Sequence, residues 1–165
     1  QWSSALTMGG AGVGTEGRFW DGSAFHLGAR GDVLFGREQG ADAGYGPYLA
    51  LGTLDFSRFE AGGGASVLAP VHDDLPLVFS LGGLLAVDDA GARPLVEASL
   101  FWGSRSYNYH SAYGMAAGLL VSVRQGVTAP HETSLLVAAQ LDFVALSLPA
   151  VAFVNWVAGP TDSAK

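Results

Sequence analysis

The charged residues of this chain are few, and most stand alone among small or apolar neighbours. The chain has 165 residues, of which 14% are charged, and its formal net charge is −7. Eight charged or amide side chains recur within extended segments: Arg30, Asp32, Glu60, Glu97, Arg105, Arg124, Gln140 and Asp142. A buried charge without a partner is costly, so charges that share an enclosed space form pairs. We therefore expect an interior salt-bridge and hydrogen-bond network, with the lining of a narrow pore as the alternative.

One His/Ser pair, His110 and Ser111 within the stretch YNYHSAYG, raises the question of nucleophilic catalysis. A serine is activated only by a base within hydrogen-bond reach. Adjacent residues of a strand point to opposite faces, so an extended His110 does not reach Ser111. We favour a protein that is not an enzyme, and keep lipid modification at His110 as an alternative. The four His residues show no metal-ligand spacing, so we expect no metal and no cofactor.

The segments that carry these residues alternate with a period of two, which is typical of β-strands. In the stretch Phe25 to Phe35, for example, bulky apolar residues alternate with small or polar ones. The expected strands are 3–14, 25–35, 47–54, 58–69, 77–87, 95–103, 110–124 and 134–143. We expect a loop at 15–22 and a turn at 88–94. The register of 47–69 stays open, because the turn at 55–57 lacks Gly and Pro.

The two faces of these strands differ in the same way from strand to strand. Leu119, Val121 and Val123 share one face, whereas Gly118 and Arg124 lie on the other. A soluble barrel turns its bulky side chains inward and covers its outside with charges. Here the polar face is too small and too sparsely charged to be a solvated surface. It fits the interior of a narrow barrel whose bulky apolar face meets hydrocarbon.

The composition agrees with a membrane barrel. Hydrophobic residues make up 49% of the chain, yet the longest apolar segment, 143–158, is interrupted and shorter than the roughly 20 residues of a spanning helix. A closed β-barrel is the other way to satisfy a backbone in lipid. The expected fold class is therefore all-β, a closed antiparallel transmembrane β-barrel of about eight strands. A single Lys gives no basic surface, so we expect no nucleic-acid partner.

Residues 3–146 resemble the small eight-stranded outer-membrane β-barrels, the class that includes the OmpA transmembrane domain and OmpX. The resemblance lies in the strand pattern, and no family motif is matched. It implies an integral protein of the bacterial outer membrane, in contact with membrane lipid, with a structural or surface-interaction role and with a signal peptide removed before Gln1. One departure is that such barrels commonly end on an aromatic residue of the last strand, whereas this chain continues past Phe143.

The chain divides into the transmembrane barrel, residues 1–146, and a C-terminal apolar segment and tail, residues 147–165. Residues 148–158 fit either a short apolar helix, capped by Ser147 and followed by Gly159, or a further strand; we favour the helix. The apolar surface of residues 147–158 makes self-association a candidate role. A porin-like narrow channel, an outer-membrane lipid-modifying enzyme and a soluble lipocalin-like binder remain as alternatives.

Overall fold

A computed structural model of the chain describes residues 4–18, 21–36, 43–69, 77–104, 117–129 and 131–142, together with Pro149 and Ala152. Within these ranges the backbone forms eight β-strands. They are β1 (Ser4–Arg18), β2 (Asp21–Gly36), β3 (Gly44–Leu54), β4 (Arg58–Ala69), β5 (Leu77–Asp88), β6 (Gly91–Ser104), β7 (Ala117–Gly126) and β8 (Thr133–Asp142). Among the residues described, no helix is both long and apolar enough to span a membrane.

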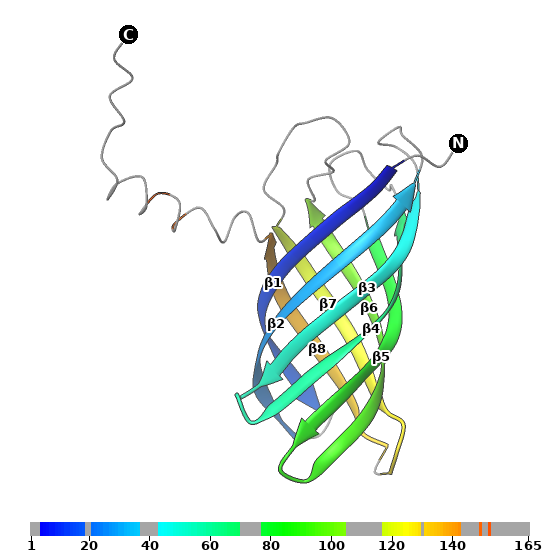
Figure 1. The fold of residues 1–165 in the computed structure, drawn as a ribbon. Helices are drawn as coiled ribbons and strands as arrows, with labels where there is room; N and C mark the ends of the chain where they lie inside the picture. Colours follow the sequence, from blue (N-terminus) through cyan, green and yellow to red (C-terminus); the bar gives the residue numbers. More distant parts are fainter. Residues whose placement is uncertain are drawn as a thin grey trace.

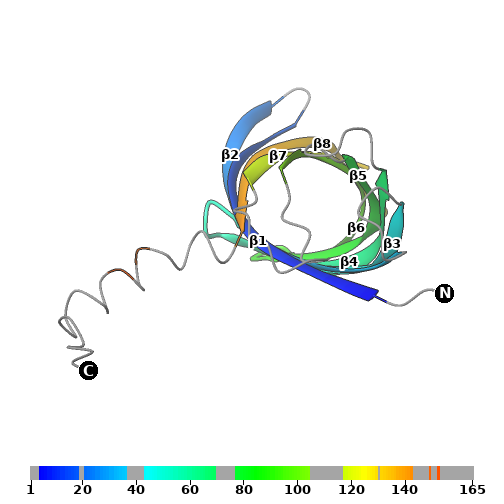
Figure 2. The same cartoon turned by 90° about the horizontal axis from the view of Figure 1, so that it is seen from above.

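The strands close into a single barrel. Each pairs antiparallel with the next, and β1 also pairs with β8, so the ring is complete (Figures 1 and 2). The strand pairs β1–β2, β3–β4, β5–β6 and β7–β8 are joined at one end, called here the hairpin end. Strand β1 starts and β8 ends at the opposite, terminal end (Figure 1). The expected all-β, eight-stranded antiparallel barrel is thus confirmed.

The structure differs from the expected loop at 15–22 and from the expected turn at 88–94. The expected loop at 15–22 is mostly strand, because β1 continues to Arg18 and pairs Glu16 with Ala24 of β2. The expected turn at 88–94 is shorter, because β6 already begins at Gly91 and pairs Pro94 with Leu85. In both places the residues favour turns by composition, but pairing with a neighbouring strand of the closed barrel satisfies their backbone and keeps them extended.

The hairpin between β3 and β4 settles the register that the sequence left open. Gly52 pairs with Glu60 and Leu54 with Arg58. Asp55 and Phe56 have φ values of 47° and 56°, the positive values that suit a tight hairpin turn. The β2 backbone supports this turn at Phe25, whose N–H donates to Asp55 Oδ1 at 2.8 Å and whose carbonyl accepts from Asp55 N at 2.9 Å. Side-chain capping therefore replaces the glycine that such a turn usually needs.

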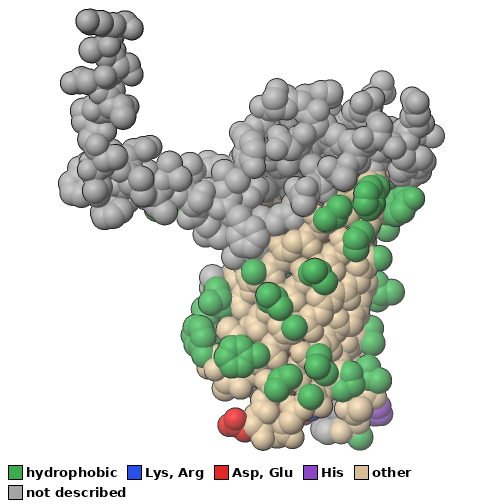
Figure 3. All heavy atoms as spheres, viewed as in Figure 1, with side chains coloured by type: hydrophobic (Ala, Val, Ile, Leu, Met, Phe, Trp, Pro, Cys, Tyr) green, Lys and Arg blue, Asp and Glu red, His purple; other side chains and the backbone are tan. Residues whose placement is uncertain are grey.

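Burial alternates along the strands and separates the outside from the lumen. Large apolar side chains such as Leu49, Leu81 and Phe59 point outward and cover the barrel wall, with few charges on the face seen in Figure 3. Many inward positions carry small, polar or charged residues. Large apolar side chains also lie inside, and Leu34, Leu68, Val78 and Phe101 form a cluster toward the terminal end, with Leu120 packed against it.

Several expectations fall on residues outside the described ranges. They concern residues 110–116 of the seventh expected strand, the boundary between barrel and tail at residue 146, and most of the C-terminal segment 147–165. In that segment only Pro149 and Ala152 are described, and two isolated positions define no element.

Candidate functional site: the polar lumen

The inward polar side chains gather in two clusters, of which the first surrounds Arg30. This Arg30 cluster consists of Arg30, Asp32, Ser66, Ser80 and Ser99. Arg30 Nε and Nη2 donate to the two carboxylate oxygens of Asp32 at 3.0 and 2.9 Å. The three hydroxyl groups accept from the same guanidinium, and the Ser66 hydroxyl also donates to Asp32 Oδ1 at 2.7 Å. One cation and one anion are thus paired and almost fully hydrogen-bonded.

The ring of Tyr48 completes the surroundings of Arg30. The guanidinium carbon lies 3.8 Å from the ring centroid, close enough for a cation–π contact. Tyr48 is among the largest fully buried side chains, and it fits because Gly82 on β5 has no side chain. A Cβ at Gly82 would collide with the Tyr48 hydroxyl oxygen. The Tyr48 side chain therefore occupies the space that a side chain at Gly82 would need.

The second cluster surrounds Arg124 and lies closer to the hairpin end. This Arg124 cluster consists of Glu16, Arg58, Glu60, Glu97, Arg124 and Ser134. Arg124 Nε donates to Glu97 Oε2 at 2.8 Å, and Arg124 Nη1 donates to both Glu16 Oε2 and Glu60 Oε2 at 2.7 Å. A single guanidinium thus joins carboxylates from β1, β4 and β6 to β7.

Arg58 and Ser134 bind the second carboxylate oxygens of Glu16 and Glu60. Arg58 Nη2 donates to Glu16 Oε1 at 3.0 Å and to Glu60 Oε1 at 2.9 Å, and the Ser134 hydroxyl also donates to Glu16 Oε1. All three carboxylates are at least 95% buried. The Arg124 cluster therefore holds three carboxylates against two guanidinium groups.

Strand parity and register bring these residues together. Glu97 of β6 and Arg124 of β7 are paired directly opposite each other, and both point inward. On β4, Glu60 follows Arg58 by two residues, so the two side chains share the inward face. Glu16 belongs to β1, which contacts β4 only through the lumen. Long arginine side chains bridge such strands across the narrow interior of an eight-stranded barrel.

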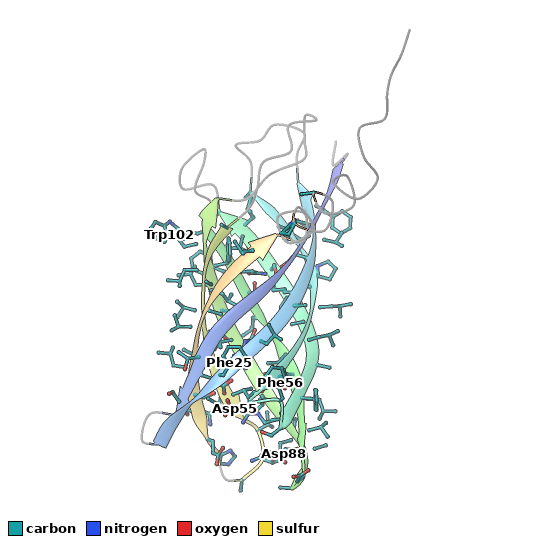
Figure 4. All side chains as sticks on the ribbon, turned by 90° about the vertical axis from the view of Figure 1, so that its left-hand side faces the viewer. Phe25, Asp55, Phe56, Asp88 and Trp102 are labelled. Carbon is teal, nitrogen blue, oxygen red and sulfur yellow. The ribbon has the colours of Figure 1, made fainter. Side chains whose placement is uncertain are left out.

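An open cavity lies at the hairpin end, outside the Arg124 cluster. It has a volume of about 490 Å³, and Glu16 and Arg58 form part of its lining together with Asp55, Asp88 and Arg93. We call it the vestibule. Asp88 and Arg93 form a salt bridge there, and Asp88 lies at the tip of the barrel in Figure 4. The Arg124 cluster thus separates the vestibule from the interior of the barrel.

The structure places five of the eight expected network residues in the two clusters. They are Arg30, Asp32, Glu60, Glu97 and Arg124. Gln140 lines a small internal cavity, where its Oε1 has no hydrogen-bond partner among the described residues. Asp142 pairs with Gly10 in the β1–β8 register, but its side chain is not described. Arg105 lies outside the described ranges.

Sequence reasoning missed Glu16, Arg58 and His26 as members of the interior. Glu16 lies in the expected loop at 15–22, although its parity matches that of Gly12 and Gly14, the small residues that precede it. Arg58 shares the parity of Glu60, and His26 that of Arg30. Extending each alternation to the end of its strand would have found all three.

The catalytic alternative at His110 is not tested by the part of the chain that the structure describes. His110 and Ser111 lie outside the described ranges. Within those ranges, no three His, Asp or Glu side chains are grouped so that they could hold a metal ion.

The fold and the inverted polarity define a class: a closed, eight-stranded antiparallel β-barrel that is apolar outside and charged inside. Among solved structures, the chain is similar to the solution NMR structure of the de novo designed TMB2.3, with 11% sequence identity and a TM-score of 0.44, over 85% of this chain and 97% of that chain. No protein-family model matches the chain, and no curated protein does.

Proposed function

We propose that this chain is an integral β-barrel protein of the bacterial outer membrane with a structural or surface-interaction role. The observation that carries the proposal is the inversion of the barrel, in which large apolar side chains point outward and charges are buried. Soluble monomers seldom expose contiguous apolar patches larger than a few hundred Å². Leu49, Leu51 and Leu81 are 73%, 64% and 62% exposed, on the same strands whose inward positions hold buried polar groups. Hydrocarbon is the surrounding that suits such a wall.

Exposed aromatic side chains lie near both ends of the apolar wall. Phe25 and Phe56 pack together near the hairpin end, with ring centroids 6.0 Å apart, and Trp102 lies near the terminal end (Figure 4). Along β2, the exposed residues Phe25 and Phe35 are ten positions apart. At about 3.3 Å per residue and a tilt of about 40°, they are separated by about 25 Å along the barrel axis. That distance matches the apolar band of outer-membrane barrels, which is about 25 Å tall.

The polar clusters favour a structural role over a channel. The Arg30 cluster joins β2, β4, β5 and β6, and the Arg124 cluster joins β1, β4, β6, β7 and β8 across the lumen. Ions would have to separate buried, hydrogen-bonded charges in order to pass. Planar-bilayer recordings should therefore show no conductance steps, and regular steps would favour the narrow channel instead.

The membrane location is tested by expressing the chain with a bacterial signal peptide. We expect it in the outer-membrane fraction, extracted only by detergent, with compact gel mobility that is lost on boiling and with a β-type circular dichroism spectrum. Extraction in buffer alone, with mobility unchanged by boiling, would instead favour a soluble lipocalin-like binder.

Self-association through residues 147–158 is a second part of the proposal. Its support is the apolar composition of this segment, which follows a barrel that already closes on itself without it. We expect the full chain in detergent to form oligomers and a variant truncated after residue 146 to be a folded monomer. Equal oligomer size for the two proteins would contradict a role of this segment.

A further inference from the structure

A small internal cavity lies between the two charged clusters. It has a volume of about 40 Å³, and its lining includes His26, Arg30, Glu60, Glu97, Arg124 and Gln140. A cavity needs roughly 10–15 Å³ of such volume to hold a water molecule, so this one has room for at least one. Because its lining supplies several hydrogen-bonding groups, water in it would find the two to four partners that it requires.

The His26 side chain is enclosed beside this cavity without a hydrogen-bond partner for its Nδ1 atom. It is only 6% exposed, and its Nδ1 atom is buried and makes no hydrogen bond with the described residues. Gly28 and Gly52 make room for the ring: an added Cβ would lie 2.6 Å from His26 Cε1 at Gly28 and 2.9 Å from His26 Nε2 at Gly52. Leaving a buried ring nitrogen without a hydrogen bond is unfavourable, and a hydrogen bond with a bound water removes that penalty.

The charges around the cavity do not balance. The described inward ionised groups are four carboxylates, Glu16, Asp32, Glu60 and Glu97, and three guanidinium groups, Arg30, Arg58 and Arg124. The Arg30 cluster is neutral, so the excess negative charge belongs to the Arg124 cluster. An uncompensated charge enclosed by an apolar wall is strongly unfavourable, and a bound proton neutralises it. A metal ion is a poorer occupant, since the described side chains offer no group of three ligands.

The groups that face this site come from most of the barrel. Of the titratable or charged side chains, His26 and Arg30 of β2, Glu60 of β4, Glu97 of β6 and Arg124 of β7 line the cavity. Behind them, Asp32 of β2 and Tyr48 of β3 contact Arg30, Arg58 of β4 contacts Glu60, and Glu16 of β1 contacts Arg124. Beside these groups, β5 and β8 contribute uncharged polar side chains, namely hydroxyl groups and the Gln140 amide. Glu16 and Arg58 also line the vestibule, so the hydrogen bonds of the Arg124 cluster lead from there to the cavity. The apolar cluster around Phe101 lies toward the opposite end.

We propose that the cavity beside His26 is a hydrated proton-binding site, in which water and one proton, shared between His26 and the carboxylates of the Arg124 cluster, complete the charge balance of the lumen. The proton comes from bulk water on the hairpin side and forms an N–H bond at His26 or an O–H bond at a carboxylate. This inference goes beyond the proposed structural role, and it can be tested on any folded barrel, in detergent or in lipid.

The test measures which side chains of the folded protein carry a proton. Infrared spectra of the folded full chain report protonated carboxyl groups, and NMR spectra with ¹⁵N-labelled histidine report whether His26 is an imidazolium. At neutral pH we expect one of these two signals, together with a cross-peak between water and the His26 ring. Neither signal, or no water contact at the ring, would overturn the proposal. So would a signal that disappears when sodium or potassium chloride is added, because a metal cation would then be the occupant.

Two variants make the test specific. Glu97→Gln leaves two carboxylates against two guanidinium groups in the Arg124 cluster, so the additional proton should be lost. Asp89→Asn removes an exposed carboxylate in the turn between β5 and β6 and should leave the signal unchanged. If Glu97→Gln keeps the signal, the charge imbalance does not hold the proton. Heat-modifiable gel mobility of both variants verifies that each is folded, so that a failure of membrane insertion is not mistaken for a failure of proton binding.

Discussion

The outer wall and the lumen of this barrel are built from the same strands with opposite chemistry. On β5, Leu81 points outward and is 62% exposed, whereas its neighbour Ser80 points inward and is 8% exposed. Outside, a residue is selected by its fit to apolar surroundings. Inside, where space is short and charges lie close together, it is selected by its hydrogen-bond partners and its volume. The same substitution should therefore have different effects on the two faces.

The largest effect should come from removing the cation that joins the lumen. Arg124→Met leaves Glu16, Glu60 and Glu97 with one guanidinium between them, and breaking such a buried pair costs about 3–5 kcal/mol. Unfolding by denaturant, followed by tryptophan fluorescence, measures this loss. It should be smaller in acidic buffer, where the carboxylates can take up protons. Val123→Met also introduces a methionine, one residue away on the outer face, where Val123 is 46% exposed, and it should change the stability little. Equal losses would contradict the assignment of the two faces.

A charge on the outer wall should be the next most harmful change, and its cost should depend on depth. Leu81→Arg lies near the middle of β5 and should cost about 2–4 kcal/mol, whereas Val87→Arg near the hairpin end should cost about 0–1 kcal/mol. Both residues are outward, at 62% and 45% exposed. Folding yield into lipid vesicles, read from heat-modifiable mobility, compares them. A wall that faces water would tolerate both substitutions equally.

Strand parity was sufficient to place many side chains on the correct face, because a period of two persists through each strand. Arg30, Asp32, Glu60, Glu97 and Arg124 could be assigned to the interior in this way. Their partners could not, because Glu16 meets Arg58 and Arg124 across the lumen, between strands that are not neighbours in the barrel. Local composition also misled at Glu16, where the strand continues only because β2 and β8 pair with it on both sides.

Gly82 and Gly83 are neighbours on β5 that differ in the space available for a side chain. A Cβ at Gly82 would collide with the Tyr48 hydroxyl oxygen, whereas at Gly83 the nearest atom is the Leu95 carbonyl oxygen at 3.6 Å. Gly82→Ala should therefore destabilise the barrel by about 1–3 kcal/mol through overpacking. Gly83→Ala adds a methyl group to the outer wall and should be nearly neutral. Denaturant unfolding of the two variants measures the difference, and a loss at Gly83 as large as that at Gly82 would show that overpacking around Gly82, against Tyr48 and the Gly63 backbone, is not the cause.

The smallest expected effect comes from Phe56, at the edge of the outer wall. Two variants there separate the cost of the backbone conformation from the contribution of the side chain. Phe56 contributes an exposed ring beside Phe25, but its φ of 56° is unfavourable for a residue with a side chain, at a cost of roughly 1–2 kcal/mol. Phe56→Ala removes the ring and keeps the backbone cost, whereas Phe56→Gly removes both. We expect the Gly variant to be more stable than the Ala variant by about 1 kcal/mol in the same denaturant unfolding assay. Equal stability would mean that the turn relaxes out of the left-handed conformation when the ring is lost. The hydrogen bonds between Asp55 and the Phe25 backbone would then not be enough to hold the turn in place.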